Sequence, residues 1–77
     1  MMIQEHDRVV LTQAVPEHGL EPGDVGAIVF VHEGGAAFEV EFVTLDGSTS
    51  TVVEVLSSHV RPVGPREIPH ARLLAEA

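Results

Sequence analysis

The fold is decided by residues 19–31, which read Gly19-Leu20-Glu21-Pro22-Gly23-Asp24-Val25-Gly26-Ala27-Ile28-Val29-Phe30-Val31. The first half predicts a tight turn, because Pro22 presets φ at the second position of a type II turn and Gly23 supplies the positive φ needed at the third. Gly26 indicates a bulge or a close backbone approach, and the five residues after it are apolar. The stretch therefore predicts a turn that leads into the longest buried strand of the chain.

The next part of the chain has the clearest alternation of apolar and acidic residues. Phe38, Val40 and Phe42 fall on one side of an extended chain, and Glu39 and Glu41 fall on the other. A period of two predicts a strand with one buried face and one wet face, which is typical of an antiparallel sheet.

Turn signals divide the rest of the chain into further short strands. Gly34-Gly35 predicts a two-residue hairpin, and Pro62 indicates a strand at a sheet edge. The predicted strands cover residues 8–12, 26–33, 36–44, 51–55 and 60–63, and a 3₁₀ turn over residues 56–59 precedes the last one. Five short strands joined by hairpins predict an all-β fold, a small five-stranded SH3-like barrel.

The predicted barrel occupies residues 1–63, and residues 64–77 have a different character. They are predicted to form a linker and a short C-terminal helix or docking tail, because Pro69 suits a first helical turn and residues 70–76 have good helix propensity. Such a helix is too short to persist alone in water. If it is ordered, something must cover Ile68, Leu73 and Leu74.

Charge limits the classes of partner. The 77 residues include twelve Asp and Glu against four Arg and no Lys, which gives a net charge of −8. Binding to nucleic acid relies on Lys and Arg that neutralise phosphates, so this balance argues against a nucleic-acid partner and favours a basic protein surface. There is no cysteine, and no apolar segment approaches the roughly 20 residues of a membrane span. The chain is therefore expected to be cytoplasmic and not to bind membranes.

Several motifs occur together in residues 8–63. They are Val9-Val10-Leu11-Thr12, Pro16-Glu17-His18-Gly19-Leu20, Gly23-Asp24-Val25-Gly26, Phe38-Glu39-Val40-Glu41-Phe42 and Arg61-Pro62-Val63. This combination resembles a family of small bacterial proteins catalogued only as a domain of unknown function, and the Gly23–Gly26 piece is similar to the opening motif of KOW-type SH3-like barrels. The resemblance implies an SH3-like barrel without an established enzymatic activity or ligand. The chain departs from the family pattern at Phe30, where a polar residue is usual, and in its tail after Val63.

Residues that could perform chemistry do not form a recognisable pattern. The five histidines are widely spaced and no cysteine accompanies them, whereas zinc ligands usually come in close pairs. Ser57-Ser58-His59 is explained by the predicted turn, because adjacent residues rarely place a nucleophile and its base in working geometry. The sequence predicts no enzyme, no cofactor and no metal site.

The direction of Phe30 decides whether an apolar surface is exposed. If Val29 and Val31 face the interior, Ile28 and Phe30 point outward and form a patch that another surface must cover. If a bulge near Gly26 shifts the register, both residues turn inward. The sequence leaves both alternatives open.

These observations favour a non-enzymatic protein–protein interaction module. Its partner would be another protein, a second copy of the chain, or a larger enzyme. The alternative is an accessory, inhibitory or immunity-type subunit whose acidic face plugs a basic active site. A nucleic-acid-binding barrel, suggested only by the KOW-like motif, ranks below both. The candidate partner-binding residues are Ile28, Phe30, Glu39, Glu41, Ile68, Leu73 and Leu74.

Overall fold

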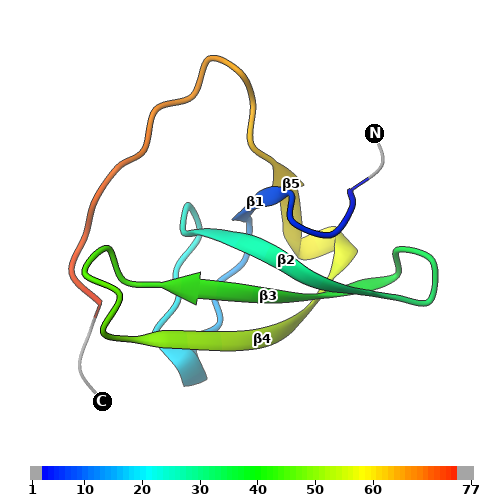
Figure 1. The fold of residues 1–77 in the computed structure, drawn as a ribbon, viewed down its shortest axis with the longest axis horizontal. Coiled ribbons are helices and arrows are strands. Elements are labelled where there is room, and N and C mark those ends of the chain that lie inside the picture. Colours follow the sequence, from blue (N-terminus) through cyan, green and yellow to red (C-terminus); the bar gives the residue numbers. More distant parts are fainter. Residues whose placement is uncertain (1–2, 75–77) are drawn as a thin grey trace.

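The computed structural model describes residues 3–74 and shows an all-β fold (Figure 1). Its elements are β1 (Arg8–Leu11), the 3₁₀ helix η1 (Pro16–His18), β2 (Val25–His32), β3 (Ala37–Val43), β4 (Ser50–Leu56), the 3₁₀ helix η2 (Ser57–His59) and β5 (Val60–Pro62). The five predicted strands and the 3₁₀ turn before the last strand are confirmed, with bounds that differ by one residue at most ends. The short helix η1 lies where the sequence predicted only a loop.

The strands form a single antiparallel sheet in the order β4-β3-β2-β1-β5. β4 and β5 are its two edges, which confirms the edge position predicted from Pro62. Within residues 3–74 no ladder joins β4 to β5, so the sheet is not closed into the predicted barrel. The two edge strands are instead connected through η2, whose single turn carries the chain from one edge of the sheet to the other.

One hydrophobic core is shared by all five strands. The residues of β3 that alternate toward it, Phe38, Val40 and Phe42, are buried, as predicted. β-Branched and aromatic side chains suit such a surface because they pack well across neighbouring strands. The core consists of Val9, Leu11, Leu20, Ile28, Phe38, Val40, Phe42, Val53, Val55 and Val60.

The turn before β2 forms as the sequence predicts. Gly23 has φ of 98°, and the Asp24 N–H donates to the Glu21 carbonyl oxygen at 3.1 Å. Gly26 lies where β2 passes closest to β3. A Cβ atom there would lie 2.5 Å from Val40 Cγ1 and 2.9 Å from a backbone oxygen of β3, so Gly26 marks a close backbone approach rather than a bulge.

The bulge lies further along β2, and it decides the direction of Phe30. Ile28 pairs with Val40 and Phe30 pairs with Glu39, so Val29 is the extra residue. Ile28 is completely buried, whereas 47% of Phe30 is exposed. Neither predicted alternative holds for both residues, because the bulge between them reverses the alternation.

The hairpin between β2 and β3 is present, but its loop is longer than predicted. Four residues, 33–36, separate the strands. Glu33, Gly34 and Gly35 have φ values of 46°, 69° and 112°. The loop needs three successive residues with positive φ, which Gly34-Gly35 alone could not supply. The Gly35 N–H closes the loop by donating to the His32 carbonyl oxygen at 2.9 Å.

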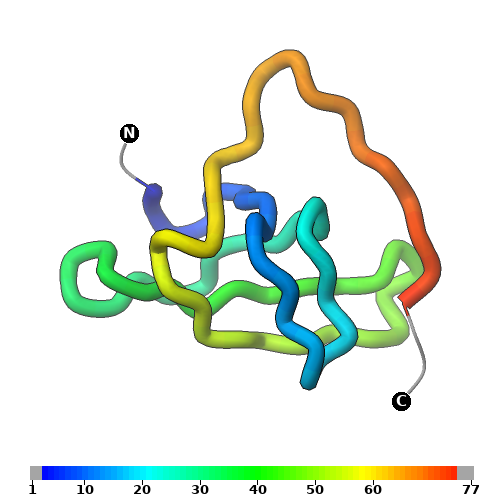
Figure 2. The backbone as a smooth tube through the Cα atoms, turned by 180° about the vertical axis from the view of Figure 1, so that it is seen from behind, coloured from blue at the N-terminus to red at the C-terminus, as the bar shows by residue number. Residues whose placement is uncertain are grey.

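The C-terminal segment, residues 63–74, is called the tail. It leaves β5, arches away from the sheet and returns beside the β3–β4 loop, as Figure 1 and the rear view in Figure 2 show. Residues 64–74 contain no helix, so the predicted helix is wrong there, and its last residues lie outside the described range. Ion pairs hold the tail at Glu67 and Arg72 in an extended path, which outweighs a weak local preference for helix.

Candidate functional site

Three strands present a mixed acidic and apolar surface on the side of the sheet away from the core. Cross-strand register places Phe30, Glu39 and Glu54 in one row. A second row contains Glu41 and Val52. We call this surface the outer face and define it by Phe30, Glu39, Glu41, Val52, Glu54 and Leu56.

Phe30 is held in place by its neighbours. Its ring meets the His32 ring edge-on, with the centroids 4.7 Å apart. His32 Nε2 in turn lies 2.8 Å from a carboxylate oxygen of Glu39. On the next row the Ser50 hydroxyl donates to Glu41 at 2.7 Å. The outer face is therefore an aromatic ring with carboxylates beside it in defined positions.

The structure separates the other predicted partner-binding residues from one another. Ile28 is completely buried and contributes nothing to an exposed surface, so its prediction as a contact residue is wrong. Ile68 and Leu73 are 88% and 92% exposed in the tail. Leu74 is half-buried and lies against a groove. The predicted residues thus divide between the outer face and the tail.

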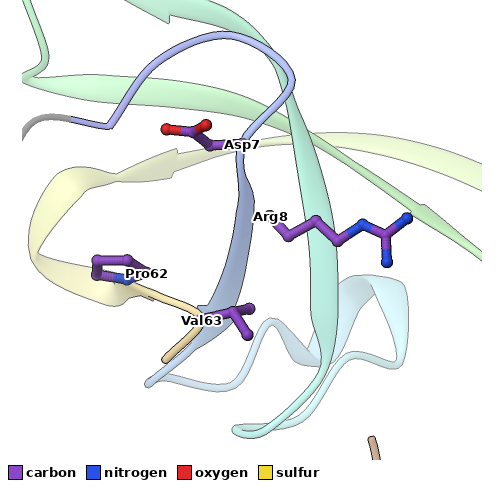
Figure 3. A pocket seen from close by; sticks show the side chains of 4 residues that line it. All are labelled: Asp7, Arg8, Pro62 and Val63. Atoms are coloured by element: carbon purple, nitrogen blue, oxygen red, sulfur yellow. The ribbon is translucent and has the colours of Figure 1, made fainter. Parts of the chain in front are cut away.

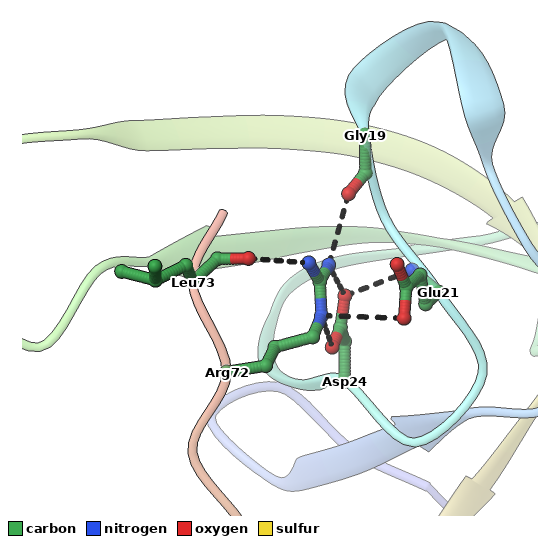
Figure 4. A network of polar contacts seen from close by, with 5 residues as sticks. All are labelled: Gly19, Glu21, Asp24, Arg72 and Leu73. Carbon is green, nitrogen blue, oxygen red and sulfur yellow. Dashed lines mark hydrogen bonds and ion pairs between the residues drawn. The ribbon is translucent and has the colours of Figure 1, made fainter. Parts of the chain in front are cut away.

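A second polar site joins the tail to the turn before β2 (Figure 4). Arg72 Nε donates to Asp24 Oδ1 at 2.9 Å, and Nη2 donates to Asp24 Oδ2 at 2.5 Å. Nη2 also donates to the Gly19 carbonyl oxygen at 2.9 Å, and Glu21 Oε1 lies 3.7 Å from Nε. Such bidentate, charge-assisted contacts are stronger and more directional than neutral ones. We call Gly19, Glu21 and Asp24 the arginine site.

The turn itself prepares the Asp24 carboxylate for this contact. Asp24 Oδ2 accepts the Glu21 backbone N–H at 2.9 Å, and only 17% of the Asp24 side chain is exposed. Partial burial acts to raise the pKa of Asp24, but hydrogen bonds from Arg72 and from the Glu21 N–H outweigh it and hold the pKa below its usual value. The carboxylate is therefore ionised throughout the neutral range.

The beginning of the tail is fixed by a separate ion pair. Arg61 donates to both carboxylate oxygens of Glu67, at 2.8 and 2.7 Å. The Gly64 N–H donates to the same carboxylate at 2.6 Å. These contacts, the Arg61 hydrogen bonds first, lower the pKa of Glu67 to about 2. This ion pair fixes the direction in which the tail leaves β5.

A groove lies between the tail and the sheet, next to the arginine site. Its volume is about 1170 Å³, and it is bounded by η1, the turn before β2, the β3–β4 loop and residues 69–74. Leu20, Val25, Phe42 and Val43 give it an apolar wall. The groove is open to solvent rather than an enclosed cavity.

A smaller hollow of about 290 Å³ is lined by Asp7, Arg8, Pro62 and Val63 (Figure 3). Asp7 and Arg8 point in different directions there. The Asp7 carboxylate accepts the Gln4 N–H at 2.9 Å, which explains its position. This hollow does not bring together groups that could perform chemistry.

Within residues 3–74, no three His, Asp or Glu side chains come together in an arrangement that could hold a metal ion. Over the same residues, no helix has the length and apolar character needed to cross a membrane.

Sequence reasoning did not find the arginine site. The sequence places Asp24 in the motif that follows the predicted turn and Arg72 in the predicted helix, and neither pattern links the two residues. The one available signal was charge, because two of the four arginines occur in the last twelve residues of an otherwise acidic chain. That signal indicates contact between tail and body, but it does not identify the carboxylate involved.

Comparison with protein families assigns the domain. A family described as Domain of unknown function (DUF4926) matches residues 5–62. The chain belongs to this family, which confirms the resemblance to a domain of unknown function. No curated protein and no solved structure matches the chain. The matched residues contain the whole sheet, the outer face and the arginine site, whereas the tail lies beyond them.

Proposed function

We propose that this chain is a non-enzymatic protein–protein interaction module that binds a basic protein surface through its outer face. The observation that carries the proposal is the row formed by Phe30, Glu39 and Glu54, in which a half-exposed aromatic ring stands at the end of a row of two β-strand carboxylates. The strand order and the 3₁₀ turn between β4 and β5 support an SH3-like topology for the module.

Apolar exposure supports a docking role. Phe30 on β2 is 47% exposed, and Val52 and Leu56 on β4 are 49% and 54% exposed, on the same face of the sheet. Apolar side chains exposed together on one face and rimmed by polar residues are typical of protein interaction sites. Aromatic residues also dominate the centres of protein interfaces, because they bury a large area at a low cost in side-chain entropy.

Charge selects the kind of partner. Glu39, Glu41 and Glu54 lie beside the apolar residues in the strand register, and the whole chain carries a net charge of −8. A basic surface would be attracted over a long range and would pair with these carboxylates at the rim of the contact. The absence of cysteine fits a reducing, cytoplasmic setting. If the partner is an enzyme with a basic active site, the same surface would make the chain an accessory or inhibitory subunit.

The experiment is affinity capture from a lysate of the source cells with the immobilised full chain and three variants. F30S removes the aromatic ring and E41K reverses a charge, and both leave the core residues in place. L45S is the matched control, because Leu45 is 97% exposed but lies in the β3–β4 loop. The proposal requires a basic protein that wild type and L45S retain and that F30S and E41K retain at least about tenfold less.

Salt provides a second criterion. Exposed charge pairs are screened at a Debye length of about 3 Å in 1 M salt, so retention must fall as salt increases. The proposal is wrong if all four proteins retain the same set of proteins, or if the retained partner is acidic. For a captured enzyme, assays with and without the module distinguish an inhibitory subunit from a simple docking module.

A further inference from the structure

One side chain makes the polar contacts that dock the far end of the tail. Between the Arg61–Glu67 ion pair and Arg72, the residues of the tail are exposed. The residue after Arg72, Leu73, is 92% exposed. Arg72 makes every side-chain hydrogen bond that is described between residues 68–74 and the sheet domain. The Arg72 side chain therefore binds to the domain in the way that a side chain of a bound peptide would.

The arginine site matches a guanidinium group in particular. Two parallel N–H groups of Arg72 meet the two oxygens of Asp24, and a further hydrogen of Nη2 meets the Gly19 carbonyl oxygen. A lysine ammonium is a compact point charge and lacks this planar arrangement of donors. The acceptors thus select for shape as well as for charge.

The site belongs to the domain and not to the tail. Gly19, Glu21 and Asp24 lie within the family match to residues 5–62, whereas Arg72 lies outside it. The turn fixes the Asp24 carboxylate through the Glu21 N–H, independently of Arg72. The domain therefore presents a formed acceptor site, and the tail brings the group that fills it.

An adjacent contact extends the recognition beyond one side chain. Leu74, two residues after Arg72, is half-buried against the groove that borders the arginine site. Leu20 and Phe42 lie in the wall of that groove. In an extended chain, residues two positions apart point to the same side. An arginine can therefore enter the arginine site while an apolar residue two positions later enters the groove.

We propose that the arginine site and its groove bind an extended segment of another protein, one that presents an arginine followed two residues later by an apolar side chain. Residues 68–74 are an internal ligand that occupies the site and competes with that segment. This proposal does not depend on the outer face, which lies on a different set of residues.

Competition by the tail must be moderate. A flexible connection of this length gives an effective concentration on the order of millimolar. Beyond Glu67, the tail is held by one arginine and by one half-buried leucine, so a partner segment with additional contacts can displace it. Only a partner segment that binds the arginine site tightly enough to displace the tail would then occupy it.

The test uses the full chain and a heptapeptide with the sequence of residues 68–74, acetylated and amidated at its ends. The R72A chain empties the site, and amide resonances of Gly19, Glu21 and Asp24 report on its occupancy by NMR. We expect the peptide to shift these resonances saturably in the R72A chain. Wild type should need at least about threefold more peptide, because its own tail competes.

Three controls examine the chemistry of recognition. A peptide carrying R72A should produce no shifts at the site, and one carrying R72K should bind several-fold more weakly. D24N added to the R72A chain should abolish binding while an amide oxygen remains for the Glu21 N–H. Unchanged resonances of Val40 in the core would show that this double variant is folded.

Several results would overturn the proposal. One is the absence of saturable shifts in the R72A chain, and another is equal binding of the arginine and alanine peptides. Equal affinity of wild type and the R72A chain would show that the tail is not a competitor. A wild-type dimer in sedimentation that becomes a monomer with R72A would show that the tail fills the site of a second copy instead.

Discussion

Replacing Gly26 by alanine examines how closely β2 and β3 are packed. The added Cβ atom would lie 2.5 Å from Val40 Cγ1, 2.8 Å from Phe42 Cε1 and 2.9 Å from the Glu41 carbonyl oxygen. The φ of Gly26 lies outside the left-handed region, so the substitution adds crowding without backbone strain. The backbone oxygen cannot turn away as a flexible side chain can, and the strands must therefore separate.

The magnitude follows from two opposing effects. Overpacking a core typically costs about 1–3 kcal/mol. Loss of the flexibility of glycine in the unfolded chain returns about 0.4–1 kcal/mol. We expect G26A to lower the free energy of unfolding by about 1–2 kcal/mol. For a domain of this size, this corresponds to a decrease in Tm of about 4–16 °C.

Urea denaturation with a matched control would measure this effect. Gly64 also lies outside the left-handed region, and the three atoms nearest to a Cβ there all belong to the solvent-exposed Glu67 side chain, the closest at 3.3 Å. G64A should therefore leave stability unchanged or slightly higher. Adding V40A to G26A should cost less than the sum of the two single changes, because they are in contact. A G26A chain as stable as wild type would refute the close approach of the two strands.

Two other predictions concern charge. Glu54 lies directly opposite Glu39, and like charges in such pairs are destabilising. E54K should therefore raise the midpoint of urea unfolding, and this gain should be smaller in 1 M salt than in low salt. An equal gain at both salt concentrations would contradict a charge effect. The pKa of Asp24 is lower in the folded chain than its ordinary value of 3.8, so the contribution of the Arg72–Asp24 pair is complete above pH 3.8 and is lost as pH falls through the lowered pKa. Arg72 Nε–H resonances should then move toward their values in a D24N chain, and a tail that stays docked after Asp24 is protonated would contradict this account.

The parts of the fold that could be predicted are those determined by neighbouring residues. Phe38 to Phe42 alternate with glutamates, and this pattern defines β3 and its buried side without reference to any other strand. Pro22-Gly23 defines its turn in the same way, because both residues have restricted or unusual φ values. The family resemblance rests on the same motifs, and the match to residues 5–62 confirms that the chain belongs to a domain family of unknown function.

The bulge at Val29 could not be predicted because its neighbours are all apolar. A run from Ala27 to Val31 has no period of two, so it does not indicate which residues face the core. Contact between Gly26 and Val40 sets the register at one end, and Phe38 sets it at the other. Val29 is the extra residue between these two registers, and its insertion turns Phe30 to the outer face.

The helix predicted in the tail is absent from residues 64–74 for a different reason. Helix propensity in residues 70–76 is a local quantity of a few tenths of a kcal/mol per residue. The contacts that decide the path of the tail join Arg72 to Asp24 and Gly19, which are distant in sequence. No spacing rule connects these positions, so neither the extended tail nor the arginine site could be derived from the pattern alone.

The pairing of β1 with β5 places both ends of the domain at one point. Val9, near the start of β1, is the partner of Pro62, the last residue of β5, and paired strands lie about 4.8 Å apart. A domain whose ends meet in this way can be inserted into a surface loop of a larger protein without separating the flanks of that loop. The geometry of this sheet therefore suits use as an inserted unit as well as a free-standing chain.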